Sequence, residues 1–332
     1  MAGLFPDAPI YTSFYAPGST YPEFADLDVR TTSLQSSIRP DHFRRSVLRL
    51  PGAFAGLDLS GFDQVLVSSS AFAHHIRHPR SVVYCYAPPH FLYDSRAYFG
   101  SRAKAAAAWP VLAPLRRRDR TAASSHGAYI AISAESARRI ASAYGRTAPI
   151  VYPPLRTEHL PLLPEPLPAE PRALIVARML PYKRVDVALS ACVQAGVGLT
   201  VVGEGPEEPR LRQLAAGHDV QFLGRLDDAA LVDLFVAHSL VLAPGIEDFG
   251  YGPVEANYAG RPVVAQAAGG ALETVENGVN GILVSGWDTG HWADAIKSAV
   301  HRSWSPAALR ESTSRFHADE FGRGIRNAMD SV

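Results

Sequence analysis

Residues 173–301 alternate between short apolar runs and segments with helical periodicity, and no other feature constrains the fold of this chain as strongly. Continuous apolar strands separated by helices are typical of a parallel sheet that is covered on both faces. We therefore expect an α/β domain with a doubly wound, Rossmann-like sheet. The expected strands are residues 173–177, 199–202, 220–223, 240–243, 262–265 and 282–284.

A proline-rich segment precedes this domain and divides the chain. Eight prolines fall within residues 149–171, and this density excludes a helix or a central strand and indicates a semi-rigid linker. The chain has 332 residues, which is more than the ~250–300 residues at which a single core stops growing. The first half is also expected to be α/β. We predict domains at residues 1–150 and 172–310, a linker at 151–171, and a terminal helical segment at 311–332.

The formal net charge is zero, but the two halves of the chain differ in sign. Residues 1–150 contain 17 Lys and Arg against 10 Asp and Glu, a net of +7, and residues 151–332 contain 15 against 22, a net of −7. No nucleic-acid-binding motif accompanies the basic half, so we expect no nucleic-acid partner. Basic residues around the apolar stretch 105–115 suit peripheral contact with an anionic membrane, although a solvated helical surface explains them equally well. These residues are Arg102, Lys104, Arg116, Arg117, Arg118 and Arg120.

The cysteine content and the apolar runs indicate the compartment. Cys85 and Cys192 form no CxxC pattern, which argues against a zinc site or a disulfide scaffold and fits a reducing cytoplasm. No signal peptide is visible at the start, and no apolar run reaches the ~18–20 residues of a membrane span. We expect a cytoplasmic protein, associated with the inner face of the membrane if the basic half binds lipid.

Residues 245–265 carry the strongest local signal for a binding site. A strand is expected to end at residue 243, and a glycine-containing loop and a helix at residues 253–259 should follow, with Pro253 in its first position. In open α/β sheets, ligands bind beyond the carboxyl ends of the strands. Glu247 in the loop and Glu255 in the first helical turn can accept hydrogen bonds from sugar or ribose hydroxyls. The alternative is that Glu255 only complements the helix dipole and that Glu247 is solvated.

Two further loops follow strands of the same domain. Arg178 and Lys183 lie where a phosphate-bearing ligand could approach, although a solvated loop is the common explanation for one basic pair. Gly203 begins a G-x-G that lacks the third glycine of a dinucleotide fingerprint. We interpret it as a tight turn that lets the backbone approach a ligand.

Taken together, these segments resemble the nucleotide-sugar-binding half of family 4 glycosyltransferases, which have the GT-B fold. The matching stretches are ARMLPYKRVD, VVGEGPEEPRL, FLGRLDDAAL, EDFGYGPVEANYAGRPVVA and GGALETVENGVNGILV, and Glu247 with Glu255 fits the family's E-x7-E motif. A narrower match in the first half is similar to mannosyltransferases of bacterial O-antigen and exopolysaccharide assembly. Its stretches are LFPDAPIYTSFYAP, LDLSGFDQVLVSSSAFA, YCYAPPHFLYD and YGRTAPIVYPPL.

The resemblance implies roles for individual residues. Arg178 and Lys183 would bind the donor diphosphate, and Glu255 would hold the ribose. Glu247, with the backbone of Phe249 and Gly250, would hold the transferred sugar. Asp248 and Gly203 complete the implied donor site. The family is metal-independent and retains anomeric configuration, so no metal or other cofactor is expected beyond the nucleotide-sugar donor.

The chain departs from the family pattern in two places. The family's first strand, normally central in the sheet, is not found before residue 4, so we expect a first domain that lacks this strand. Tyr86 stands where the family has a sugar-contacting His, and His90 is the candidate substitute, although a solvated loop histidine is the alternative. His74 and His75 are weaker candidates, and a surface position at the end of a helix is the alternative.

The sequence therefore predicts two Rossmann-like domains, with a last helix that crosses back to the first domain. The predicted activity is transfer of a hexose, mannose from GDP-mannose being the favoured donor, to a glycan or lipid-linked acceptor. Catalytic candidates are Glu247, His90 and Tyr86. The alternative is a non-catalytic truncated homologue that binds a nucleotide sugar or partners an active transferase. An epimerase or phosphorylase of the same fold is weaker, since such enzymes do not carry the E-x7-E segment in this form.

Overall fold

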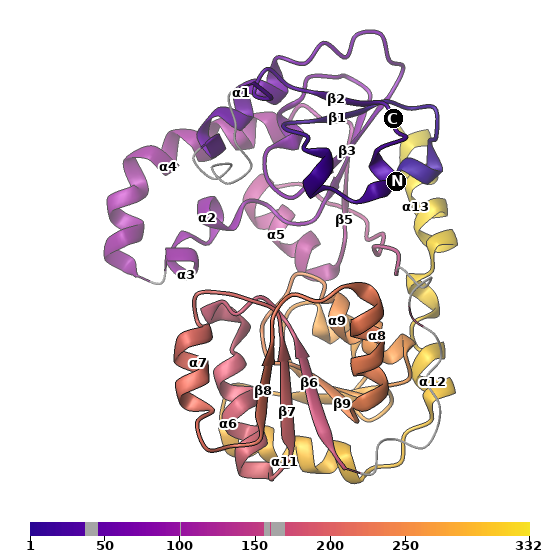
Figure 1. Ribbon diagram of the computed structural model, residues 1–332. Coiled ribbons are helices and arrows are strands. Elements are labelled where there is room, and N and C mark those ends of the chain that lie inside the picture. The colour runs from indigo at the N-terminus through magenta and orange to yellow at the C-terminus, as the bar shows by residue number, and fades with distance from the viewer. Residues whose placement is uncertain (37–45, 100, 156–159, 161–169) are drawn as a thin grey trace. The chain divides into compact units, whose positions relative to one another are not determined.

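A computed structural model describes residues 1–36, 46–99, 101–155, 160 and 170–332 (Figure 1). Most of the predicted linker, at residues 156–159 and 161–169, lies outside the described residues. The chain divides into two compact units. Unit 1 contains Met1–Tyr152 and Asp319–Val332, and unit 2 contains Pro153–Ala318.

Unit 2 is built on a six-stranded parallel sheet with the order β11-β10-β9-β6-β7-β8. Each strand expected from the apolar runs is found, with bounds that differ by no more than one residue. The agreement arises because strands buried on both faces must be apolar throughout. The strands are β6 (Arg172–Val176), β7 (Gly198–Val202), β8 (Val220–Leu223), β9 (Leu240–Ala243), β10 (Val263–Gln266) and β11 (Gly281–Val284).

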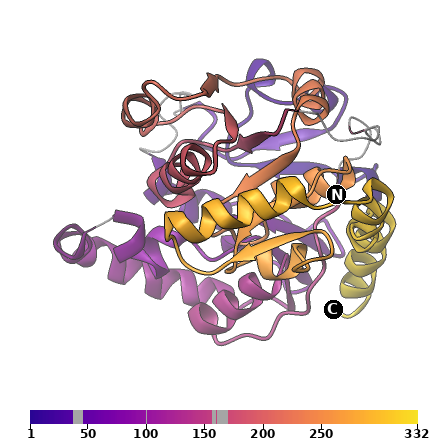
Figure 2. The same cartoon turned by 90° about the horizontal axis from the view of Figure 1, so that it is seen from below.

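Helices cover both faces of this sheet and enclose two hydrophobic cores (Figures 1 and 2). Side chains of successive strand residues point to opposite faces, so Leu174 and Ile175 belong to different cores. Ile175 lies in the core that contains Trp292 of α11, and Leu174 in the core that contains Phe235 of α8. The helices are α6 (Val185–Ala195), α7 (Glu208–Leu214), α8 (Asp228–Ala237), α9 (Tyr251–Tyr258), α10 (Ala271–Thr274), α11 (Thr289–His301) and α12 (Pro306–Glu311).

Unit 1 has two parallel sheets that share no strand within the described residues. One pairs β1 (Ile10–Thr12) with β2 (Val29–Thr31), and the other has the order β3-β4-β5. Unit 1 thus has a two-stranded and a three-stranded parallel sheet in place of the single sheet of unit 2. The other strands are β3 (Val65–Ser69), β4 (Ser81–Cys85) and β5 (Ala128–Ala131), and the helices are α1 (Leu50–Ala55), α2 (His90–Tyr93), α3 (Ser95–Phe99), α4 (Arg102–Ala123) and α5 (Ala134–Tyr144).

The last helix, α13 (Ala318–Asp330), packs on unit 1, which confirms the expectation that the chain crosses back. Its buried face includes Phe321, whose ring lies edge-on to Tyr84 with centroids 5.4 Å apart. The side chain of Gln64 donates a hydrogen bond of 2.9 Å to the carbonyl of Met329. Residues far apart in sequence are therefore held in one core. No described helix is both long enough and apolar enough to cross a membrane.

Truncating a buried side chain of α13 should destabilise unit 1. Ile325 is fully buried, so Ile325→Ala leaves a cavity and is expected to lower the free energy of unfolding by about 2–5 kcal/mol. Urea unfolding followed by near-ultraviolet circular dichroism measures the change. Asn327→Ala is the matched control, because Asn327 is exposed on the same helix. Equal effects of the two substitutions would show that α13 is not packed as described.

Candidate functional site

The sheet of unit 2 has a topological switch point between β6 and β9. The chain runs from β6 to β7 and β8 on one side, and from β9 to β10 and β11 on the other. The loops that follow β6 and β9 therefore leave neighbouring strands at their carboxyl ends and turn in opposite directions. A crevice at such a point is the general ligand site of open α/β sheets. Arg178 and Lys183 lie in the first loop, and Glu247 lies in the second.

Glycines allow the loops at this edge to pack backbone against backbone. A Cβ added to Gly245 would lie 2.9 Å from Cα of Lys183. The β9 loop therefore packs directly against the backbone of the β6 loop at this residue. One added to Gly270 would lie 2.1 Å from the carbonyl oxygen of Phe249, and the Gly270 amide donates a 2.8 Å hydrogen bond to the carbonyl of Glu247. Any larger residue would push these loops apart. Gly245 and Gly270 are absent from the predicted site residues, and their only sequence signal is their position just after a strand.

Gly203 has a similar role on the other side of the switch point. Its φ of +123° lies in a region that favours glycine, and an added Cβ would lie 2.2 Å from the carbonyl oxygen of Ala177. The tight turn is as expected. The backbone that approaches Gly203 in this structure belongs to the β6 loop, so Gly203 supports the position of that loop.

Lys183 and Glu247 form an ion pair across the switch point. The Nζ of Lys183 contacts Oε1 of Glu247, and the side chains are 17% and 36% exposed, respectively. Burial lowers the pKa of Lys183 to about 8, the positive charge of Arg178 acts in the same direction, and Asp248 opposes the shift. Lys183 is thus a desolvated cation next to a second cation. Lys183 attracts anions strongly, because little water screens its charge, and the exposed Arg178 adds a second positive charge nearby.

The remaining donor-site candidates surround this pair. Arg178 is exposed and Asp248 is half-buried. Phe249 is 3% exposed, with its ring against Tyr251 at 5.1 Å and Phe316 at 5.4 Å between centroids. The buried side chain of Phe249 therefore holds the β9 loop in place. Only its backbone remains available to a ligand at the carboxyl edge of the sheet. Gly250 has a φ of +84° and precedes the first residue of α9.

The structure corrects the position of Glu255 within its helix. The sequence places the start of the helix at Pro253 and Glu255 in the first turn, but α9 starts at Tyr251, so Pro253 is the third residue and Glu255 the fifth. The helix starts earlier because Gly250, in a left-handed conformation, makes the turn into it. Burial, and to a lesser degree the charge of Asp228, raises the pKa of Glu255. A half-buried carboxylate beyond the first turn is a poor complement to the helix dipole, which weakens the purely structural explanation.

Tyr86 and His90 lie in unit 1, next to the carboxyl end of β4. Tyr86 follows this strand directly, and its ring packs edge-on against Tyr84 with centroids 5.6 Å apart. His90 is the first residue of α2, and its Nδ1 lies 3.4 Å from Nη1 of Arg139. Both side chains are half-buried. Their proposed catalytic roles stay predictions.

The surface position considered as the alternative for His74 and His75 is wrong. They are 1% and 4% exposed, respectively, in a short 3₁₀ helix (Ala73–His75) packed in the core of unit 1. Both rings face Asp119 of α4, which is itself fully buried. This contact cannot be predicted from the sequence, because Asp119 lies 44 residues from His75 and its neighbours in sequence are arginines.

Comparisons with known proteins match the sequence of unit 2 most directly. Residues 170–302 match the family described as Glycosyl transferases group 1. The D-inositol 3-phosphate glycosyltransferase of Mycolicibacterium smegmatis is 37% identical over 158 residues, which cover 44% of this chain and 36% of that protein. The Mycobacterium tuberculosis protein of the same name is 38% identical over 143 residues, or 39% and 30% of the two chains. The chain thus spans only 36% and 30% of the length of these two curated relatives.

Solved structures extend the similarity to nearly the whole chain. Anabaena HepE in complex with UDP and glucose has a TM-score of 0.64 at 19% identity, covering 98% of this chain and 92% of that chain. Sucrose-phosphate synthase from Thermosynechococcus elongatus has a TM-score of 0.67 at 16% identity, with coverages of 90% and 82%. These similarities confirm the fold expected from the sequence. The chain has the α/β fold of GT-B glycosyltransferases, and its residues 170–302 match glycosyl transferases group 1.

Proposed function

We propose that this protein is a retaining glycosyltransferase that moves a hexose from a nucleotide diphosphate sugar to a glycan or lipid-linked acceptor. The observation that carries the proposal is the contact between Lys183 and Glu247 at the switch point of a domain that matches glycosyl transferases group 1. Lys183 supplies a cation for a diphosphate, and Glu247 beside it supplies a carboxylate for sugar hydroxyls. Transfer of a sugar from a nucleotide diphosphate breaks the bond between the sugar and the diphosphate, so the groups that bind these two parts must lie close together.

The roles of the residues follow from charge and burial. Lys183 and Arg178 offset the charge that grows on the departing diphosphate in the transition state. Glu247 accepts hydrogen bonds from the transferred sugar once the donor has displaced its contact with Lys183, and the backbone of Phe249 and Gly250 lies next to the same sugar. Glu255 accepts hydrogen bonds from the ribose hydroxyls.

The identity of the donor rests on weaker support. The first-half resemblance favours mannose from GDP-mannose, whereas the Anabaena HepE structures contain UDP, glucose or UDP-glucose. The curated relatives are named for D-inositol 3-phosphate, which suggests a phosphorylated polyol as another acceptor class. A screen of GDP-mannose, UDP-glucose and dTDP-glucose with product analysis by mass spectrometry distinguishes these possibilities.

A non-catalytic nucleotide-sugar-binding protein is the second candidate function. It is supported by the split sheet of unit 1 and by Tyr86 at the position where the family has a histidine. Such a protein would bind a nucleoside diphosphate and yet neither transfer nor hydrolyse any sugar. Product formation with any donor and acceptor would contradict it.

Replacing Lys183 should weaken nucleotide binding. Lys183→Ala removes a desolvated positive charge, and we expect the affinity for the nucleoside diphosphate to fall by about 1.5–3 kcal/mol in isothermal titration calorimetry. Lys297→Ala is the matched control, because Lys297 is an exposed lysine of α11 in the same unit. Equal affinities of the two variants would remove Lys183 from the donor site. Failure of GDP, UDP and dTDP to bind the unmodified chain would contradict both candidate functions.

Nucleotide affinity should also depend on pH. The pKa of Lys183 is about 8, so the side chain is mostly charged at pH 7 and mostly neutral at pH 9. Since the diphosphate binds the charged form, its affinity should fall roughly tenfold between these pH values. The same titration on Lys183→Ala should show a much flatter profile. A profile of the unmodified chain that is as flat as that of the variant would show that Lys183 does not control the affinity.

We also propose that α4 makes peripheral contact with the cytoplasmic face of a membrane. This helix exposes Trp109 and Val111, which are 50% and 52% accessible, within a run of basic residues. Each of Arg117→Gln and Arg118→Gln should lower binding to anionic vesicles about fivefold in co-sedimentation, since one basic residue near the surface contributes about 1 kcal/mol. Arg212→Gln in α7 of unit 2 is the control. No binding of the unmodified chain to anionic vesicles would contradict the contact.

A further inference from the structure

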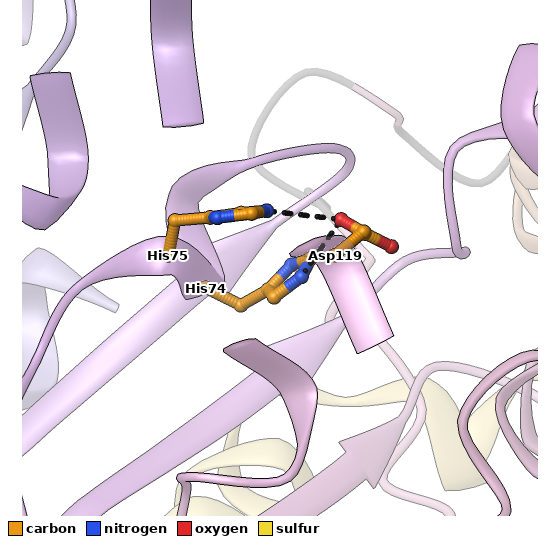
Figure 3. Close-up of side chains that lie close together, drawn as sticks. All are labelled: His74, His75 and Asp119. Carbon is orange, nitrogen blue, oxygen red and sulfur yellow. Dashed lines mark hydrogen bonds and ion pairs between the residues drawn. The ribbon is translucent and has the colours of Figure 1, made fainter. Parts of the chain in front are cut away.

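The core of unit 1 contains a cluster of three side chains that the proposed activity does not use. His74 and His75 belong to the 3₁₀ helix between β3 and β4, and Asp119 belongs to α4 (Figure 3). Their side chains are 1%, 3% and 0% exposed, respectively. Within the part of the chain that the structure describes, they are the one group of three or more potential metal ligands.

The reactive atoms of these residues converge on one point. The Oδ1 atom of Asp119 lies 3.1 Å from Nε2 of His74 and 3.1 Å from Nε2 of His75. One ligand atom from each residue lies within 4.8 Å of the other two. Two hydroxyls fix the other carboxylate oxygen, since Tyr93 and Tyr144 donate hydrogen bonds of 2.9 and 3.0 Å to Oδ2. The carboxylate is thus oriented so that Oδ1 faces both imidazole rings.

The hydrogen bonds around His74 leave one of its ring nitrogens unsatisfied. Nδ1 lies 3.4 Å from Oγ of Ser69, and this hydroxyl also contacts the carbonyl of Ala71. Nε2 of His74 is fully buried, has no hydrogen-bond partner of good geometry, and lies 3.1 Å from Oδ1 of Asp119. When Ser69 donates to Ala71, Nδ1 carries the ring hydrogen and the Nε2 lone pair faces this oxygen, which is unfavourable unless a cation lies between them.

We propose that His74, His75 and Asp119 bind one divalent transition-metal ion, with zinc as the best fit. Zinc binds imidazole nitrogen and carboxylate oxygen at about 2.0–2.2 Å, so two such ligands on a tetrahedral ion lie about 3.3 Å apart. The observed separations of 3.1 Å are close to this value. The hydrogen bonds to Oδ2 correspond to the outer-shell contacts that orient metal-binding carboxylates. Calcium and magnesium fit less well, because they prefer ligand sets made only of oxygen.

The ion would have a structural role in unit 1. It would join the connection between β3 and β4 to the long helix α4, two segments that are otherwise linked by side-chain packing and hydrogen bonds. This site lies outside the donor-binding domain, so it is separate from the metal-independent chemistry expected of the family. The competing explanation is a hydrogen on Nε2 of His74, which would then donate to Oδ1 of Asp119 without any metal.

Zinc binding to the full chain tests the proposal. The protein is produced without a histidine tag, stripped with a chelator, and titrated with Zn²⁺ by calorimetry. We expect one high-affinity equivalent per chain, and we expect the bound ion to raise the thermal unfolding temperature. His75→Asn and Asp119→Asn should each weaken this binding at least a hundredfold. The absence of a high-affinity equivalent in the unmodified chain would overturn the proposal and favour a hydrogen on Nε2 of His74.

A matched control separates coordination from general damage to the core. His126 is also buried beside His74, but its ring nitrogens contact Oγ of Ser81 and the carbonyl of His74. His126→Asn should therefore keep the zinc equivalent even if it lowers stability. Loss of zinc binding in this variant to the same degree as in His75→Asn, with both variants folded, would contradict the assigned ligands.

Two further measurements apply if the ligand variants fail to fold. Tyr144→Phe leaves all three ligands and removes one hydrogen bond to Oδ2, so it should weaken zinc binding about 10- to 100-fold. Co²⁺ added to the stripped unmodified chain should give the visible absorption of a nitrogen- and oxygen-ligated ion, and one equivalent of Zn²⁺ should abolish it. Unchanged zinc affinity in Tyr144→Phe, or Co²⁺ absorption that zinc does not displace, would count against the site.

Discussion

The close backbone contacts between loops at the carboxyl edge of the unit 2 sheet determine where its functional groups lie. A parallel sheet covered on both faces has no room for polar chemistry along its strands, so charged groups must collect at the strand ends. Glycine at residues 203, 245 and 270 lets four loops approach one another more closely than any side chain would permit. Because the loops are held so tightly, Lys183 and Glu247 meet although they follow different strands.

The ion pair has a consequence for ligand binding. An anionic ligand that binds Lys183 must displace the carboxylate of Glu247. The displaced carboxylate can then accept hydrogen bonds from the hydroxyl groups of a ligand. A nucleotide sugar offers both groups in one molecule, whereas inorganic phosphate offers only the first. The pair therefore favours a ligand that satisfies both partners, since an unpaired charge in a half-buried position is costly. If the donor binds here as proposed, this preference depends only on the two side chains and their burial.

The sequence predicts some parts of this structure much better than others. The strands of unit 2 are found to within one residue, because continuous apolar runs between helices leave few alternatives. The start of α9 is misplaced by two residues, since the left-handed conformation of Gly250 is not visible in the pattern of residue types. The burial of His74 and His75 is not predicted, because nothing in the local sequence shows that Asp119 will pack against them. Contacts between distant residues decide burial, and a single sequence does not record them.

The polar groups of the two units differ in exposure, and this difference separates the kinds of ligand they suit. Lys183 and Glu247 keep 17% and 36% of their side-chain surface accessible, so a metabolite can reach them from the edge of the sheet. The side chains of His74, His75 and Asp119 keep 3% or less, and aromatic rings of Tyr93, Tyr129 and Tyr144 surround them. A substrate could not enter such a cluster without unfolding the core. A ligand of these residues must therefore be as small as an ion and bound as part of folding, which is how structural metals act in other proteins.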